Sequence, residues 1–123
     1  MSTDPDRRRP RGVYSVGDDP DPRFSFANER TFLAWIRTAL ALMAAGVALE
    51  ALEVPASSGP RTALVVGLTV LGGACSIAAY VRWARSERAL RLSKPLPPPA
   101  LAPLLAFGLV VAAAVITVVL VVD

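Results

Sequence analysis

Two arginines interrupt the first apolar segment of the chain, which reads N-E-R-T-F-L-A-W-I-R-T-A-L-A-L-M-A-A-G-V-A-L-E over residues 28–50. On a helix, Arg30 and Arg37 lie within about 20° of each other and about 10.5 Å apart along the axis. A guanidinium is always charged and binds anions through several N–H donors. The spacing therefore predicts two anion-contacting side chains on one face of a membrane helix.

The two faces of this predicted helix differ in side-chain size. The arginine face carries small residues, among them Ala34, Ala41 and Ala45, and the opposite face carries bulky ones: Phe32, Ile36, Leu40, Met43 and Val47. In a membrane, small faces mark close helix packing or a lined cavity. We therefore expect the bulky face to contact lipid and the alanines to pack against another helix.

The depth of Arg37 leaves three interpretations open. Twelve uncharged residues separate it from Glu50, which is about 18 Å of helix, whereas a bilayer core is about 30 Å thick. Arg37 then lies inside the inner boundary. It either snorkels to the headgroups, pairs with a carboxylate or helix carbonyls (Glu29 is the nearest acid on the helix), or lines a cavity with Arg30.

Other residues are candidates for supporting roles. Thr31 and Thr38 lie beside the arginine face and are expected to bond helix carbonyls or a neighbouring helix. The second apolar segment carries small residues for helix packing, namely Gly67, Gly72 and Gly73. Basic residues follow that segment in R-W-A-R-S-E-R-A-L-R, where Arg82, Arg85 and Arg88 are either a solvated helix end or a basic collar at the mouth of a cavity.

Composition restricts the chemistry. The 123 residues are 54% hydrophobic and 19% charged, with one Cys and no His. This excludes disulfide frameworks, thiolate–imidazole metal sites and histidine-based acid–base catalysis. No catalytic residues, cofactor, metal or nucleic-acid partner are expected, and we do not expect an enzyme.

The apolar residues form three blocks, which predicts an all-α integral membrane protein with three transmembrane helices. Residues 1–20 are predicted to be a disordered cytoplasmic tail, and residues 21–123 a three-helix membrane domain with spans at about 33–54, 62–83 and 100–122. The first helix is expected to begin with Asp21 as its cap and Pro22 in its first turn, and to continue to about Glu53.

Basic residues predict the orientation of the spans. Seven precede or open the first span and five lie between the second and third, which leaves Arg61 alone in the first loop. Since Lys and Arg accumulate on the cytoplasmic side, the N-terminus is predicted to be cytoplasmic and the C-terminus outside.

Two stretches carry a family resemblance. The run A-N-E-R-T-F-L-A-W-I-R-T-A-L-A-L-M-A-A-G-V-A-L, and E-R-A-L-R-L-S-K-P-L-P after the second span, resemble the YidH-like family of small bacterial inner-membrane proteins. The resemblance covers about residues 20–122 and implies a multi-pass protein of the bacterial inner membrane, whose biochemical role is unsettled in that family.

The same domain resembles the membrane part of the eukaryotic vacuolar transporter chaperone complex, which makes polyphosphate and passes it through a channel of five three-helix units. That resemblance implies a homo-oligomer, a pentamer above all, in which Arg30 and Arg37, with Glu29 beside them, guide a polyanion at the cytoplasmic mouth. The chain departs from it in one respect, because a tail of about 20 residues is too short to form a polyphosphate-sensing or polymerase domain.

Two functions are therefore expected from the sequence. The first is an oligomeric conduit for an anion or a polyphosphate-type polyanion in the lipid bilayer. The alternative is a non-transporting membrane scaffold or accessory subunit that binds an unidentified membrane or cytoplasmic protein.

Overall fold

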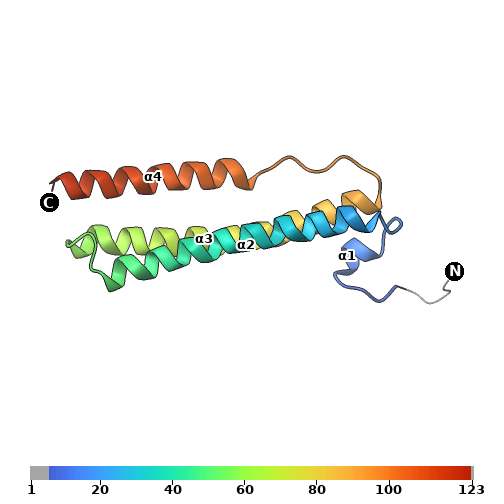
Figure 1. Ribbon diagram of the computed structural model, residues 1–123, viewed down its shortest axis with the longest axis horizontal. Helices are drawn as coiled ribbons and strands as arrows, with labels where there is room; N and C mark the ends of the chain where they lie inside the picture. Colours follow the sequence, from blue (N-terminus) through green and yellow to red (C-terminus); the bar gives the residue numbers. More distant parts are fainter. Residues whose placement is uncertain (1–5, 123) are drawn as a thin grey trace.

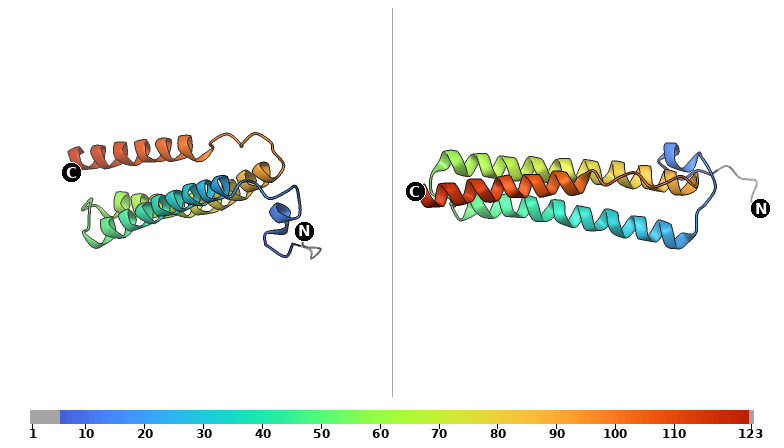
Figure 2. Two further views of the ribbon diagram at one scale, coloured as in Figure 1. Left: turned by 45° about the vertical axis from the view of Figure 1, so that its right-hand side comes forward. Right: turned by 90° about the horizontal axis from the view of Figure 1, so that it is seen from above.

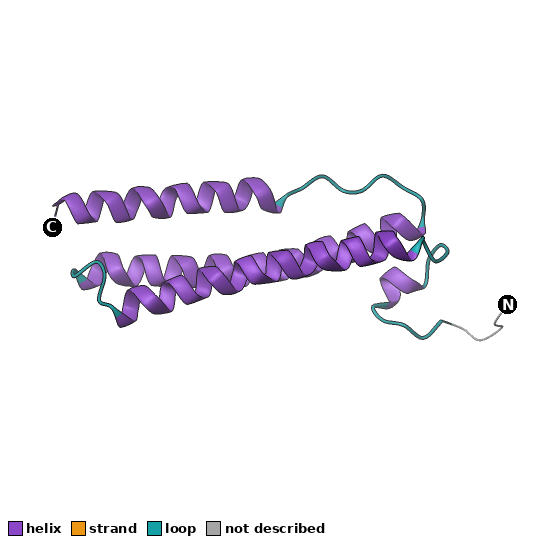
Figure 3. Cartoon of the chain, viewed as in Figure 1, coloured by secondary structure: helices purple, strands orange, loops and turns teal. Residues whose placement is uncertain are grey.

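The computed structural model describes residues 6–122 and is all-helical over that range, with no strand (Figure 3). A short helix α1 (Arg11–Tyr14) precedes three long ones, α2 (Pro22–Ala51), α3 (Ser58–Arg91) and α4 (Leu101–Val122) (Figure 1). Each long helix is apolar and long enough to cross a membrane. The predicted fold class, three membrane helices without strands, is confirmed for the described residues.

The α2 helix begins as the sequence predicts. The Asp21 side chain accepts a hydrogen bond of 2.9 Å from the backbone N–H of Arg23, and Pro22 occupies the first turn. The helix ends at Ala51, two residues before the predicted end, because Glu53 adopts a left-handed conformation with φ of 52°. A tight loop then leads into α3.

Helices α2 and α3 form an antiparallel hairpin (Figure 2). Small and medium-sized residues line the seam between them. Ala39 and Leu42 from α2 are buried against Leu68 and Cys75 from α3. A Cβ added at Gly72 would lie 2.8 Å from Met43 Cγ and 2.9 Å from the Ala39 carbonyl oxygen. The two backbones therefore approach closely at this glycine.

The bulky face of α2 does not point uniformly to lipid, in contrast to the expectation from the sequence. Phe32, Ile36 and Met43 pack against the buried core, whereas Leu40 and Val47 are exposed. The reason is that α3 offers mostly small residues at the seam, so the larger side chains of α2 fill the space above them.

Helix α4 packs on α3 and makes no close backbone approach to α2 within the described residues. Leu71 of α3 lies against Gly108 of α4, where an added Cβ would be 2.8 Å from Leu71 Cδ2. The connector at residues 92–100 runs back along the hairpin without regular structure, so α4 lies beside the part of the hairpin that is nearer the α2–α3 loop (Figure 1). This leaves one end of the hairpin uncovered by α4.

The helix lengths place that uncovered end relative to the bilayer. The 22 residues of α4 span about 33 Å, close to the bilayer core of about 30 Å. The 30 and 34 residues of α2 and α3 span about 45 and 51 Å. The hairpin therefore extends beyond the core at what we call the basic end, made by residues 22–30 of α2 and 82–91 of α3.

Candidate functional site

The five predicted anion-contacting arginines lie in three different places. Arg30 and Arg37 are exposed on the outer face of α2, and neither makes a hydrogen bond or ion pair within the described residues. Arg82 and Arg85 border a hollow of about 150 Å³ with the connector before α4. Arg88 Nη1 donates a 2.5 Å hydrogen bond to the carbonyl of Gly12. One chain alone does not bring the five together.

The alanines of the arginine face have no partner helix within the described chain. Ala34, Ala41 and Ala45 are exposed. Of the predicted packing glycines, Gly72 packs closely, while a Cβ added at Gly67 or Gly73 would meet nothing within 4 Å. The close approach of α2 and α3 occurs at Gly72, which lies opposite Ala39, and at Gly46, which was not among the predicted packing residues.

The two threonines bond to their own helix, one of the expected alternatives. The Thr31 and Thr38 hydroxyls donate to the carbonyls of Ala27 and Ala34, at 3.0 and 3.2 Å. Glu29 forms no ion pair with an arginine within the described residues. It lines a groove on a different part of the surface.

A buried polar junction joins α2 to α3 at the basic end. Glu87 is 4% exposed, and its carboxylate accepts hydrogen bonds from the Ser25 hydroxyl at 2.5 Å and the Asn28 amide at 3.1 Å. The Asn28 amide also donates to the carbonyl of Trp83 at 3.0 Å. Both donors to Glu87 are neutral, and no Arg or Lys pairs with it in the described chain.

The sequence held a signal for this junction. Asn28 precedes the partly buried Trp35 and the buried Leu42 by one and two heptads, so it lies on the face of α2 that packs against α3. A polar residue on a packing face needs a polar partner. Glu87, the acid within the arginine-rich end of α3, is that partner.

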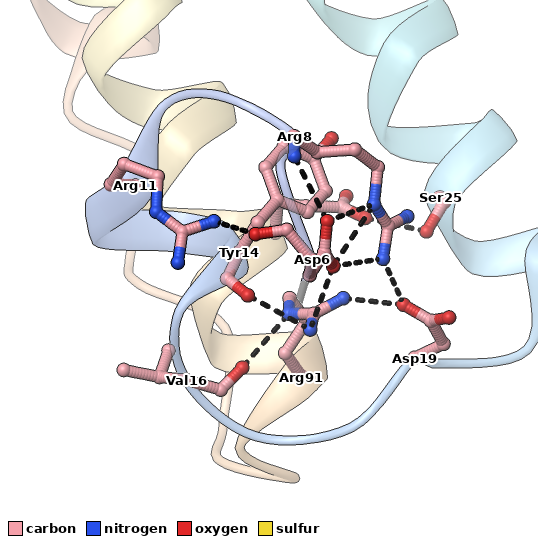
Figure 4. A network of polar contacts seen from close by, with 9 residues as sticks. Asp6, Arg8, Arg11, Tyr14, Val16, Asp19, Ser25 and Arg91 are labelled. Carbon is pink, nitrogen blue, oxygen red and sulfur yellow. Dashed lines mark hydrogen bonds and ion pairs between the residues drawn. The ribbon is translucent and has the colours of Figure 1, made fainter. Parts of the chain in front are cut away.

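The segment before α2 contacts α3 instead of remaining free. The composition of residues 1–20 predicts a disordered tail, but residues 6–20, which we call the N-terminal segment, wrap around the end of α3 (Figure 4). The Arg91 side chain, 5% exposed, donates to Asp19 at 2.5 Å and to the carbonyls of Val16 and Tyr14 at 2.9 and 3.3 Å. The hydrogen bonds of this arginine supply the order that the composition does not predict.

Three further features fix the N-terminal segment. The Asp18 backbone N–H donates to the Arg91 carbonyl at 3.1 Å. Gly17 has a φ of +61°, and a Cβ there would lie 2.1 Å from the same carbonyl oxygen. The guanidinium groups of Arg8 and Arg91 lie 4.5 and 5.3 Å from the centre of the Tyr14 ring. Only glycine fits position 17 while this packing holds.

Ion pairs add to this docking. Hydrogen bonds from Arg8, and then from Arg91, hold the pKa of the Asp19 carboxyl below its usual value. The pKa of Asp6 is lowered for a similar reason, chiefly by the Arg8 side chain, which bonds it at 2.6 Å. The Asp19 side chain is 68% exposed and that of Asp6 31%, so solvent screens their contribution to stability.

An aromatic groove opens between α2 and α3 beside the junction. It has a volume of about 360 Å³ and is lined by five aromatic residues, two carboxylates and one serine: Tyr14, Phe26, Phe32, Tyr80, Trp83, Glu29, Glu87 and Ser25. A second hollow of about 250 Å³ shares Tyr14, Ser25, Phe26 and Glu87 with it and adds Arg8. The N-terminal segment forms one wall of both hollows through Tyr14.

Fold and surface together define a small multi-pass helical membrane protein. The comparisons then give the family. Residues 23–89, which cover α2 and nearly all of α3, match the family described as a domain of unknown function (DUF202). The chain belongs to this family, the YidH-like proteins of the bacterial inner membrane.

Two relatives show how far the similarity extends. The chain is 48% identical over 87 residues to the inner membrane protein YidH of Escherichia coli, covering 69% of this chain and 75% of that one. It is 51% identical over 81 residues to an uncharacterized protein of Mycobacterium tuberculosis, covering 64% and 66%. No solved structure matches the chain significantly. The resemblance to the YidH-like family is confirmed, and so is the location in the bacterial inner membrane.

Proposed function

We propose that several copies of this chain assemble through the outer face of α2 and form a conduit for an anion or polyanion. One observation carries the proposal. Arg37 is exposed, lies within a membrane helix and makes no ion pair or hydrogen bond within the described residues. A charge in that position has to be hydrated, paired or covered.

The depth of Arg37 supports this reasoning. Phe32 of α2 and Tyr80 of α3 line the same groove, so they lie at about the same depth in the membrane. Leu101, the first residue of α4, lines a hollow with Ala78, two residues before Tyr80, so α4 begins at about that depth too. Arg37 lies five residues further along α2, about 7.5 Å deeper than Phe32. A charged arginine at the centre of a bilayer costs about 2.5–3.5 kcal/mol on insertion scales, and less near the edge.

The surroundings of Arg37 favour cover by a second copy. The alanines on this face leave room for close approach of another helix, and α4 of the same chain does not reach α2. In a closed ring, Arg30 and Arg37 of each copy would line a shared axis. The excess of basic residues at this end favours the cytoplasmic side, and in that orientation the arginines would stand at the cytoplasmic mouth.

The resemblance to the vacuolar transporter chaperone membrane domain adds the class of cargo. It suggests five copies and a phosphate-rich polyanion. Because the chain offers no set of catalytic groups, the proposed role is transport rather than catalysis.

A non-transporting scaffold is the second candidate, favoured by a specific observation. Arg82, Arg85 and Arg88 face the connector and the N-terminal segment, so they do not extend the arginine face of α2. A surface that serves only to bind another membrane protein needs no continuous arginine path.

A flux assay separates the two candidates. Purified protein is reconstituted in liposomes loaded with chloride or with short-chain polyphosphate, and efflux is compared between the wild type, Arg37→Gln and Arg9→Gln. Arg9 is exposed and lies in the N-terminal segment, so its substitution removes the same charge away from α2. A conduit predicts loss of flux in Arg37→Gln alone, with assembly unchanged. Equal efflux in all three proteins contradicts the conduit.

A further inference from the structure

The aromatic groove has the composition of a site for an organic cation. Five aromatic rings and the carboxylates of Glu29 and Glu87 line it, and no Lys or Arg does. Aromatic faces attract ammonium groups through their quadrupole, most strongly at Trp. Carboxylates add charge and accept the N–H donors of a primary ammonium. The groove therefore disfavours anions, in contrast to the outer face of α2.

Glu87 supplies the buried charge of this site. Its carboxylate has about four acceptor positions, of which Ser25 and Asn28 occupy two. Neither donor carries a charge, and no cation pairs with Glu87 in the described chain. Since burying a carboxylate without a cationic partner is costly, an ammonium group that enters beside Glu87 would be stabilised by it.

The groove lies where lipid headgroups lie. Its inner wall is formed by Phe32 and Tyr80, at the level where α4 begins and the hydrocarbon core ends. Its outer wall is formed by Tyr14 and Glu87, beyond that level. Tyr and Trp side chains are common at this depth because their rings are amphipathic. A headgroup could therefore enter with its acyl chains remaining in the bilayer.

The adjoining hollow complements the rest of such a headgroup. It shares Tyr14, Ser25 and Glu87 with the groove and is also lined by the guanidinium groups of Arg8 and Arg91 and by the Asp19 carboxylate. The Arg8 side chain is 52% exposed and pairs with Asp6 and Asp19 at 2.6 Å, but a guanidinium has five N–H donors. A phosphate next to Arg8 would gain a charge-assisted hydrogen bond. The two hollows thus present acceptors for an ammonium group and a donor for a phosphate side by side.

We propose that this groove binds the headgroup of a phospholipid that carries an ammonium group, of the phosphatidylethanolamine class. The ammonium lies among the aromatic rings beside Glu87 and Glu29, and the phosphate lies toward Arg8. The N-terminal segment closes the site through Tyr14. This proposal does not depend on anion conduction.

Native mass spectrometry of the protein released from nanodiscs tests the site. The nanodiscs contain equal amounts of phosphatidylethanolamine and phosphatidylglycerol, which differ in the ammonium group. The wild type is expected to retain phosphatidylethanolamine preferentially. Glu87→Gln should lower that preference about tenfold, since charge-assisted hydrogen bonds are lost, and Trp83→Leu by a similar order, since a cation–π contact is lost.

Two further variants guard against misfolding. Glu29→Gln changes an exposed groove residue whose side chain makes no hydrogen bond or ion pair within the described residues, so a lower preference in this variant reports on the site and not on the fold. Glu53→Gln removes a carboxylate beyond the opposite end of α2 and should leave the preference unchanged. Equal retention of the two lipids by the wild type would overturn the proposal. Displacement of the lipid by an equal concentration of soluble phosphoethanolamine would also overturn it, because the acyl chains would then contribute nothing.

Discussion

A single methyl group at position 17 should release the N-terminal segment. Gly17 has a φ of +61°, and a Cβ there would lie 2.1 Å from the Arg91 carbonyl oxygen. The left-handed conformation alone costs a residue other than glycine about 1–2 kcal/mol, and the contact cannot be relieved by a side-chain rotation because the oxygen belongs to the backbone. Gly17→Ala is therefore expected to raise the undocked population at least 5- to 30-fold.

Hydrogen exchange measures this population directly. The Asp18 amide donates to the Arg91 carbonyl, so its exchange in nanodiscs should accelerate by the same factor as the segment opens. Gly12→Ala is the matched control, since a Cβ at Gly12 meets nothing within 4 Å, and it should leave exchange unchanged or slower. If Asp18 exchanges equally fast in the wild type and in Gly17→Ala, the docked segment is not the resting state and this reasoning fails.

Two further predictions concern the α2–α3 seam and the ion pairs of the N-terminal segment. Gly72→Ala should lower the stability of the hairpin by about 1–3 kcal/mol, as overpacking does, because the new Cβ presses on the Ala39 carbonyl; unfolding in mixed detergent micelles measures it, with Gly67→Ala as an unaffected control. Docking of the N-terminal segment should also weaken in acid. The pKa of Asp19 is lowered in the folded protein, chiefly by Arg8, so its contribution is complete above the usual value of 3.8 and is lost as the pH falls through the lower, folded value. Hydrogen exchange of the segment, corrected for intrinsic rates, should show less protection at about pH 3 than at about pH 6, and pH-independent protection would argue against the Asp19 pairs.

The membrane helices could be predicted because their signals are local and additive. Apolar length identifies each span, and the Asp21–Pro22 pair marks the start of α2. The face that α2 presents to α3 could not be predicted in the same way. It depends on the small residues that α3 offers opposite Phe32 and Met43, and a single helix does not contain that information.

The N-terminal segment escaped prediction for a different reason. Besides Asp19, Arg91 bonds to the carbonyls of Tyr14 and Val16, and backbone acceptors are the same at every residue. Gly17 was the one local signal for the docked conformation, and a glycine in a polar segment is equally typical of a flexible tail. Glu87 lies in a run of arginines that gives no sign of its role, which is to bond Asn28 across the hairpin.

The measurement that tests the proposed function most directly is the native mass of the protein in lipid nanodiscs. An uncovered Arg37 on a face of small residues predicts a closed ring, so the particle should contain several chains of 13.0 kDa each, with five as the expected number. A particle with one chain would contradict the account, because three helices cannot enclose an aqueous path and the α2 face would then contact lipid.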